Sequence, residues 1–338
     1  MSRRIRTQVG AALAICCMAL CAALPATAQN KSEPLDLQGH RGARALLPEN
    51  SLPAFARALS LGVTTLELDI AITKDGVPVI SHDPALNPDI TRGPDGQFLA
   101  ARGPAISTLT FDELSRYDVG AIKPGTNYAR QFASQTPMDG TRIPKLADLF
   151  ALVRQSGNTQ VRFAIETKLS PLAPHETVAP EAFARAVIGA IREGGMESRS
   201  SILSFDWRTL KVVQQEAPGI PTVYLTIQQR TNNNVQADSP WTAGMRLRDH
   251  GSVPKMIKAA GGNTWSSYWG DLSRTDVEEA QGLGLKVLAW TVNDAAQIGR
   301  MIDLGVDGVV TDRPDVAREE MARRGLPLPA ATPVTAGR

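Results

Sequence analysis

The stretch that decides the fold is residues 39–84, GHRGARALLPENSLPAFARALSLGVTTLELDIAITKDGVPVISHDP. Three short apolar runs, typical of buried strands, lie in or beside it and alternate with turns and one helical segment. Glu67 and Asp69 lie within the second run, and because residues i and i+2 of a strand face the same side, their carboxylates should point together. His40 follows the first run and His82 ends the third. The stretch therefore predicts a site that holds a metal and moves protons.

Outward from this stretch, strand-like and helix-like runs alternate along the chain, which predicts a parallel sheet with helices outside it. Polar residues follow most strands, as in a TIM (β/α)8 barrel, whose active sites lie at the carboxyl ends of the strands. A doubly wound sheet would need an early glycine-rich phosphate turn, which the sequence lacks. The expected strands are 35–40, 64–72, 77–82, 161–166, 201–205, 222–226, 263–268, 286–291 and 308–311; the expected helices are 51–61, 110–117, 145–155, 181–193, 207–216, 273–282, 295–304 and 315–324.

This strand list is one longer than an eight-stranded barrel requires, so we expect either 222–226 or 263–268 to be peripheral. The turn at 74–76 leaves no room for a helix between the second and third strands, so the barrel should be irregular there. An irregular segment rich in Gly, Pro, Asp and Thr, residues 84–143, follows the third strand, and a loop of this length usually has a function or forms a subdomain. A second irregular stretch covers 228–262.

The N-terminus has the pattern of a secretory signal peptide over residues 1–28: a positive start, an apolar run and a small-x-small cleavage site. A membrane anchor or a lipid on Cys21 are the alternatives, but the apolar run is short for a span and bulky Leu20 precedes the cysteine. We therefore expect export to the periplasm or the cell exterior without a stable membrane anchor. The remaining divisions are a linker at 29–34, the barrel at 35–324 and a disordered tail at 325–338.

Composition narrows the chemistry of the exported chain. All three cysteines lie in the predicted leader, so the remainder can have no disulfide, no thiolate metal site and no cysteine nucleophile. The whole chain has a net charge of +2, and removal of the three leader arginines leaves 33 basic against 34 acidic residues. This balance does not predict a nucleic-acid surface. The roughly 310 residues that remain are enough for one large domain.

A second pair of charged side chains, Glu166 and Lys168, lies at i and i+2 of another expected strand. One interpretation of Glu166 and Lys168 is a simple salt bridge. For Glu67 and Asp69 the corresponding alternative is a solvent-exposed pair of carboxylates. If the strands adjoin, Glu166 would instead complete an oxygen-rich site suited to Mg²⁺ or Ca²⁺ rather than zinc. The planar fork of Arg41 suits phosphate oxygens.

The two strand-end histidines, His40 and His82, suit acid/base work on either side of a phosphate, with zinc ligation as the alternative. Glu49 and Asn50 follow Pro48, and orienting Arg41 and His40 is at least as plausible for them as direct chemistry. The remaining histidines, His175 and His250, lie in irregular segments and are expected to be bystanders.

Nine segments, spread over almost all of the chain after the leader, resemble in order the signature blocks of the glycerophosphodiester phosphodiesterase family. Any one block is a weak signal, but nine in sequence are a strong one. The segments are His40-Arg41-Gly42, Pro48-Glu49-Asn50-Ser51, Glu67-Leu68-Asp69, Lys74-Asp75-Gly76-Val77-Pro78-Val79, His82-Asp83-Pro84, Glu166-Thr167-Lys168, Ser204-Phe205-Asp206, Trp290-Thr291-Val292-Asn293 and Val306-Asp307-Gly308-Val309-Val310-Thr311-Asp312.

The resemblance implies a TIM barrel that hydrolyses small glycerophosphodiesters to glycerol 3-phosphate and an alcohol with one divalent cation, Ca²⁺ or Mg²⁺. The residues and roles that it implies are Glu67, Asp69 and Glu166 as metal ligands, His40 and His82 as the acid/base pair, Arg41 and Lys168 as phosphate ligands, and Trp290 as a wall on the glycerol side.

The chain departs from the family pattern in two places. Ser51 replaces the usual threonine, and the block at 140–146 lacks a glutamate, which bears on a loop role but not on the metal triad. A lipid-directed phosphodiesterase with a similar barrel and a non-catalytic secreted binding protein are the rival functions. The section 241–269, rich in tryptophan, could shape alcohol specificity or could simply pack.

Overall fold

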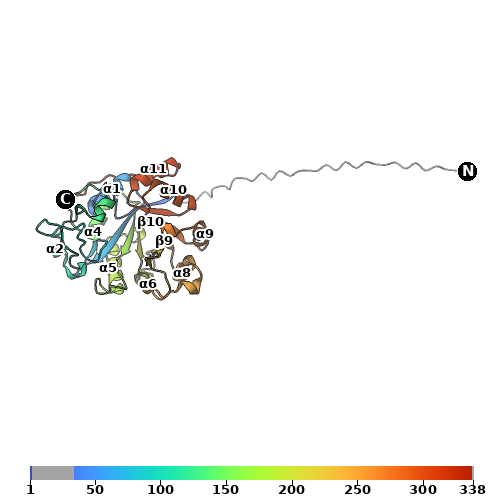
Figure 1. Cartoon of the computed structure of the whole chain (residues 1–338), viewed down its shortest axis with the longest axis horizontal. Coiled ribbons are helices and arrows are strands. Elements are labelled where there is room, and N and C mark those ends of the chain that lie inside the picture. The colour runs from blue at the N-terminus through green and yellow to red at the C-terminus, as the bar shows by residue number, and fades with distance from the viewer. Residues whose placement is uncertain (2–33, 337–338) are drawn as a thin grey trace. The chain divides into compact units, whose positions relative to one another are not determined.

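The computed structural model describes residues 1 and 34–336, so the predicted signal peptide and most of the linker lie outside the described residues. Eight parallel strands close into a barrel with helices around it (Figure 1), because the first strand of the sheet also pairs with the second strand in sequence. This confirms the predicted TIM barrel. In their order around the barrel the strands are β1 (Asp36–Gly39), β11 (Gly308–Thr311), β10 (Lys286–Trp290), β9 (Thr264–Tyr268), β6 (Thr222–Thr226), β5 (Ser200–Ser204), β4 (Arg162–Thr167) and β2 (Thr65–Ile72).

The ninth strand of the sheet is β3 (Pro78–Ile80), which runs antiparallel to β2 and stands outside the closed barrel. The expectation that 222–226 or 263–268 would be peripheral is therefore wrong, since both lie in the barrel as β6 and β9. The physical reason is the turn at 74–76, which returns the chain directly beside β2 and permits only an antiparallel neighbour. The barrel is therefore irregular at this turn, as predicted, and the irregularity is a β2–β3 hairpin that adds a ninth strand to the sheet outside the barrel.

The helices begin and end close to the predicted positions. Ser51 caps α1, its hydroxyl accepts a hydrogen bond from the amide of Ala54, and Pro53 lies in the first turn. Alternation on β2 holds as expected: Leu66, Leu68 and Ile70 are fully buried in the core between strands and helices. The helices are α1 (Leu52–Leu61), α2 (Phe111–Leu114), α3 (Asn127–Gln131), α4 (Leu146–Gln155), α5 (Pro180–Glu193), α6 (Trp207–Glu216), α7 (Leu247–His250), α8 (Val253–Ala259), α9 (Arg274–Gly282), α10 (Ala295–Leu304) and α11 (Pro314–Arg323), with short 3-10 turns at η1 (Ile106–Thr108), η2 (Glu197–Arg199), η3 (Pro240–Thr242) and η4 (Trp269–Asp271).

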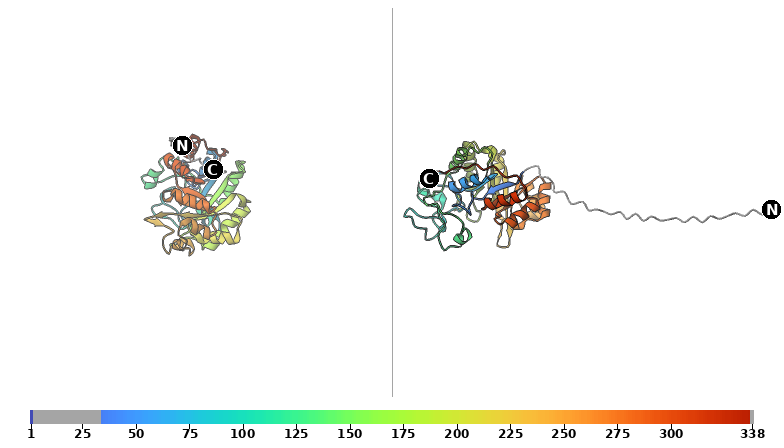
Figure 2. Two further views of the ribbon diagram at one scale, coloured as in Figure 1. Left: turned by 90° about the vertical axis from the view of Figure 1, so that its right-hand side faces the viewer. Right: turned by 90° about the horizontal axis from the view of Figure 1, so that it is seen from above.

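The segment between β3 and α4 is largely irregular, as predicted, and has its own small core around Leu86, Ile106 and Leu114. It lies at one end of the barrel domain, away from α9 and α10 (Figure 2). Thr110 and Glu113 form a capping box at the start of α2. The second irregular stretch is more ordered than predicted, because it contains α7, α8 and the small hairpin of β7 (Gln228–Gln229) and β8 (Asn232–Asn233).

The segment after α11 differs from the prediction of a disordered tail. The amide of Thr332 donates to the carbonyl of Leu59 at 2.9 Å, and Val334 and Ala336 pack against the core. The proline-rich composition of this segment favours extended backbone, which here lies along the barrel domain. None of the helices within residues 34–336 has the length and apolarity needed to cross a bilayer.

Candidate active site

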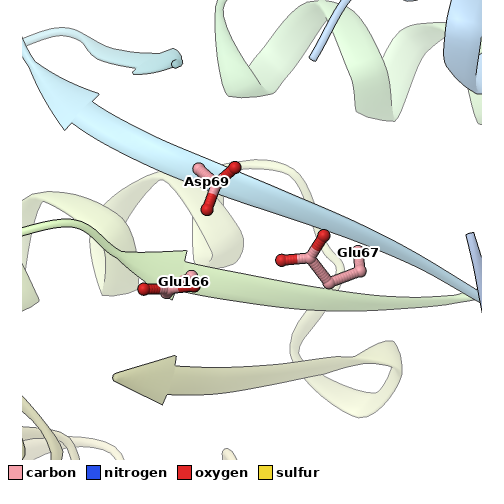
Figure 3. Close-up of side chains that lie close together, drawn as sticks. All are labelled: Glu67, Asp69 and Glu166. Carbon is pink, nitrogen blue, oxygen red and sulfur yellow. The ribbon is translucent and has the colours of Figure 1, made fainter. Parts of the chain in front are cut away.

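Three buried carboxylates lie together inside the barrel on two adjacent strands. Glu67 and Asp69 project from β2, and Glu166 projects from β4, where strand register places it directly beside Asp69 (Figure 3). One oxygen of each lies within 4.8 Å of the others. Parallel pairing of β2 with β4 therefore brings Glu166 to Glu67 and Asp69, which lie 99 and 97 residues earlier in the chain.

The electrostatics of this triad fit a bound cation. Burial and then the neighbouring charge of Asp69 raise the pKa of Glu67 well above its usual value, and burial raises the pKa of Glu166 to about 7. The Oδ1 atom of Asp69 is buried without a hydrogen-bond partner. Three mutually repelling carboxylates with an unsatisfied buried oxygen form the hard, oxygen-rich donor set that Mg²⁺ and Ca²⁺ prefer.

Arg41 hydrogen-bonds to Glu49 and Glu67 and lies beside Asp69. Its guanidinium donates to Glu49 Oε1 at 2.7 Å, its Nε lies 3.1 Å from Asp69 Oδ2 without hydrogen-bond geometry, and its backbone amide donates to Glu67 Oε2 at 2.9 Å. These carboxylates raise the pKa of Arg41 although burial alone would lower it. Its backbone has a φ of 49°, which non-glycine residues rarely adopt, so the turn after β1 aims the side chain at the triad at some conformational cost.

Glu49 contacts Arg41 and Asn50 contacts Asp69, whereas the predicted role of these two residues, to orient Arg41 and His40, stays a prediction. Glu49 also accepts a hydrogen bond from the hydroxyl of Tyr128, on α3. Asn50 donates from Nδ2 to Asp69 Oδ2 at 2.9 Å. Burial alone would raise the pKa of Asp69, but Arg41 and the other nearby cationic groups outweigh that effect and lower it, so this carboxylate is ionised.

Lys168 adds a second positive charge to the triad. Its Nζ donates to Glu166 Oε1 at 2.7 Å and lies 3.6 Å from Asp69 Oδ1. Burial alone would lower the pKa of Lys168, but these carboxylates raise it. The salt bridge with Glu166 considered as an alternative is therefore present, and it lies within the carboxylate cluster rather than replacing it.

His40 is held by a buried aspartate, Asp312, which directly follows β11, the strand paired with β1. Its Nδ1 lies 2.6 Å from Asp312 Oδ1, which leaves Nε2 facing the triad, 3.8 Å from Glu67. Asp312 is itself fixed by a two-pronged hydrogen bond from Arg44 and by Nδ2 of Asn293. Burial and then the charge of Arg44 lower the pKa of His40 to about 4, so the imidazole is neutral at neutral pH and Nε2 can accept a proton.

His82 is also paired with an aspartate, but its side chain is more exposed than that of His40. Its Nδ1 lies 2.8 Å from Asp83 Oδ1, and Asp83 accepts a second hydrogen bond from Asn87. The side chain of His82 is 33% exposed against 13% for His40. Burial, followed by the charges of Arg41 and Lys168, lowers the pKa of His82. Both histidines thus have one ring nitrogen paired with a carboxylate and the other available at the site.

A cavity of ≈ 160 Å³ joins most of these groups. Small side chains at Ala164, Ser201 and Ser266 leave space in the barrel interior, which bulkier layers fill in many barrels of this fold. Trp290 stands in its wall, donates from Nε1 to the carbonyl of Ser266 and meets Phe205 edge-on at 5.4 Å. Seven predicted site residues line it: His40, Arg41, Glu67, His82, Glu166, Lys168 and Trp290.

The other predicted site residues lie nearby: Asp69 in the triad, and Glu49 and Asn50 behind Arg41 and Asp69. His175 and His250 do not line the described cavity. Sequence reasoning assigned no role to Asp312 or Arg44. Asp312 follows β11 directly and is among the polar residues that the strand-end rule marks, but that rule does not show that it would pair with His40. Tyr128 gave no such signal, because it lies in an irregular segment.

Comparison with known proteins places these residues in context. Residues 40–316 match the model of the glycerophosphoryl diester phosphodiesterase family. A glycerophosphodiester phosphodiesterase of Caldanaerobacter subterraneus subsp. tengcongensis is 29% identical over 82% of this chain and 93% of its own length. A crystal structure from Silicibacter pomeroyi DSS-3, assigned as a glycerophosphoryl diester phosphodiesterase, is 34% identical over 87% of this chain and 95% of that one, with a TM-score of 0.79.

A more distant crystal structure shares the fold. The Oleispira antarctica phosphodiesterase, solved in complex with the product sn-glycerol-3-phosphate, is 20% identical over 86% of this chain and 97% of that one, with a TM-score of 0.61.

Proposed function

We propose that this chain, which belongs to the glycerophosphoryl diester phosphodiesterase family, hydrolyses glycerophosphodiesters to glycerol 3-phosphate and an alcohol with the help of one divalent cation. Membership makes it a phosphoric diester hydrolase. The observation that carries the finer proposal is one cavity lined by two carboxylates of the triad and by two histidines, each paired with an aspartate.

Glu67, Asp69 and Glu166 would hold the cation, Ca²⁺ or Mg²⁺. When bound, it supplies positive charge against the oxygens of the phosphodiester. Arg41 and Lys168 lie beside the same carboxylates, and their guanidinium and ammonium groups bind and orient the phosphate. Because both cationic side chains are already held by carboxylates, they need little reorganisation when substrate arrives.

The two histidines move protons. Asp312 and Asp83 each accept from an imidazole Nδ1–H, which leaves Nε2 free to take a proton from the nucleophile or to give one to the departing alcohol. The nucleophile is either water or the substrate's own glycerol hydroxyl. The similar pairing of His40 and His82 supports an acid/base pair without deciding which is the acid.

The test of this function is release of glycerol 3-phosphate from glycerophosphocholine by the purified enzyme, in the presence of Mg²⁺ or Ca²⁺ and after treatment with EDTA. We expect turnover that EDTA abolishes and that one of the two cations restores. Full activity in EDTA would refute the role of the carboxylates as metal ligands. Absence of turnover with every glycerophosphodiester offered would refute the proposed substrate class.

We also propose that the enzyme is exported, on the strength of the charge and hydropathy pattern of residues 1–28. N-terminal sequencing of the protein recovered from a periplasmic extract should start near Gln29. A mature protein that retains Met1 and stays with the cytoplasmic fraction would contradict export.

A further inference from the structure

A second cavity adjoins the catalytic one and extends outward from it. Its volume is ≈ 250 Å³, and it shares four lining residues with the first cavity: His82, Glu166, Lys168 and Phe205. A phosphodiester has two organic arms, so a phosphate bound at this shared boundary would direct one arm into each cavity. The remaining walls come from the loops after β4 and β6, and from Asp83 and Pro84 after β3.

The two cavities differ in ways that assign the arms. The inner one is smaller and offers hydroxyl and amide groups from Ser201, Ser266 and Gln38, which suits a small polyol such as glycerol. The outer one is larger, and in addition to Phe205, which lines both cavities, it has the indole of Trp241 in its wall. The alcohol arm therefore belongs to the outer cavity.

The charges around the outer cavity indicate what kind of alcohol it accepts. Among the described residues that line it, Lys168 is the single lysine or arginine, and this ammonium is already held by Glu166 and Asp69. Two further carboxylates, Asp83 and Glu176, line the same space. Excess negative charge next to an aromatic side chain, here Trp241, is the combination that binds a cation with an apolar body.

Glu176 is fixed in place rather than free to turn away. Its Oε1 lies 2.8 Å from Arg102, a residue that does not line the cavity, and its backbone carbonyl accepts from the hydroxyl of Ser107. Arg102 offsets part of the negative charge of Glu176, but the ion pair also anchors the loop that carries Glu176. The side chain of Glu176 is 20% exposed, so a ligand that enters the cavity can reach it.

We propose that the outer cavity binds the departing alcohol and selects a cationic amino alcohol of the choline or ethanolamine type, with Trp241 and Glu176 as the specificity-determining residues. This inference rests on the proposed phosphodiesterase function. A neutral polyol would gain nothing from the negative charge of Asp83 and Glu176 or from the indole of Trp241, and an anionic arm would meet like charge.

The experiment compares kcat/KM for glycerophosphocholine with kcat/KM for glycerophosphoglycerol, whose alcohol arm is uncharged. We expect the wild type to favour the choline diester. Trp241→Ala should lower the ratio of the two values about tenfold, the loss expected for a desolvated cation–π contact, and Trp241→Phe should restore most of it. Glu176→Gln should lower the ratio about threefold. The matched control is Glu181→Gln, which alters an exposed acidic residue of α5 outside the cavity and should leave the ratio unchanged.

A wild-type ratio near one, or variants that slow both diesters equally, would overturn the inference while leaving the phosphodiesterase function intact. If Trp241→Ala does not fold, the Glu176→Gln ratio decides. Direct binding separates the two proposals further: choline should bind the wild type more tightly than 3,3-dimethylbutan-1-ol, its uncharged analogue, and Glu176→Gln should reduce that difference. Equal binding of the two probes would refute a cation-selective cavity even in an active enzyme, and selective choline binding without turnover would refute only the phosphodiesterase function.

Discussion

The inner and outer halves of the site are built from different parts of the barrel. The carboxylates of the inner half stand on β2 and β4, where strand pairing fixes their spacing. The outer half contains Glu176 and Trp241, which lie in the connections between strands and helices. Side chains on strands are held more precisely than side chains on loops, and loops accept changes with less cost to the fold. The comparison teaches that this protein keeps the chemical groups on its rigid part and the proposed selectivity on its variable part.

The largest effect should come from the rigid half. Glu166→Gln removes one charge of the triad but keeps the shape of the side chain, and Lys168 then loses its closest partner, at 2.7 Å. We expect kcat/KM to fall by roughly a thousandfold or more, because metal affinity and phosphate positioning are lost together. Metal content after dialysis and steady-state kinetics measure the two losses. Activity within tenfold of the wild type would show that the strand-borne carboxylate is dispensable and would remove the contrast.

A smaller loss is expected when a group acts through another residue. Asp312→Asn keeps the packing but weakens the hold on His40 Nδ1, so kcat should fall about a hundredfold with little change in KM. The pH–rate profile distinguishes a positioning role from simple unfolding, because only loss of positioning shifts the limb that belongs to His40. Unchanged kcat and an unchanged profile would show that His40 does not depend on this aspartate.

Acidification should weaken the binding of the metal ion. Burial raises the pKa of Glu166 to about 7, so acidification from pH 8 to pH 6 protonates this ligand and should reduce cation affinity about tenfold. The metal-free protein should respond in the opposite direction. A raised folded-state pKa stabilises the fold below the unfolded value and loses that contribution as pH rises through about 7, so metal-free stability should fall between about pH 4.5 and 7. Titration calorimetry and thermal melting, each at several pH values, measure the two trends. Cation affinity that is flat from pH 6 to 8 would exclude Glu166 as a titrating ligand.

The sequence predicted more of the inner half of the site, which stands on strands, than of the outer half, which stands on loops. The i, i+2 spacing of Glu67 and Asp69 and the strand ends at His40 and His82 are local signals. In the structure Glu67 and the two histidines line one cavity, and Asp69 lies beside Glu67 in the triad. Glu166 joins them only because β4 pairs with β2, which the predicted barrel implied without giving the register.

The errors have physical causes of a longer range. Propensity could not show that β3 would turn back on β2 instead of entering the barrel, because the difference lies in the pairing partner and not in the strand itself. The segment around Thr332 looked disordered by composition, yet the amide of Thr332 donates to Leu59 of α1, about 270 residues earlier, and its hydroxyl accepts from Asn158. The tryptophans of 241–269 suggested a role in alcohol specificity, but the sequence could not show that Trp241 lines one cavity with Glu176, since both lie in segments without a periodic pattern.

The smallest effect should come from the surface of the variable half. His175 precedes Glu176 directly on the loop after β4, but its side chain is exposed and does not line either described cavity that contains His82 and Lys168. His175→Ala should therefore leave kcat/KM for every glycerophosphodiester within twofold, since exposed substitutions away from a site rarely matter. The same steady-state assay compares it with Glu176→Gln, its neighbour in sequence. If His175→Ala changed the choline-to-glycerol ratio as much as Glu176→Gln does, selectivity would depend on the loop as a whole and not on the side chains that face the cavity.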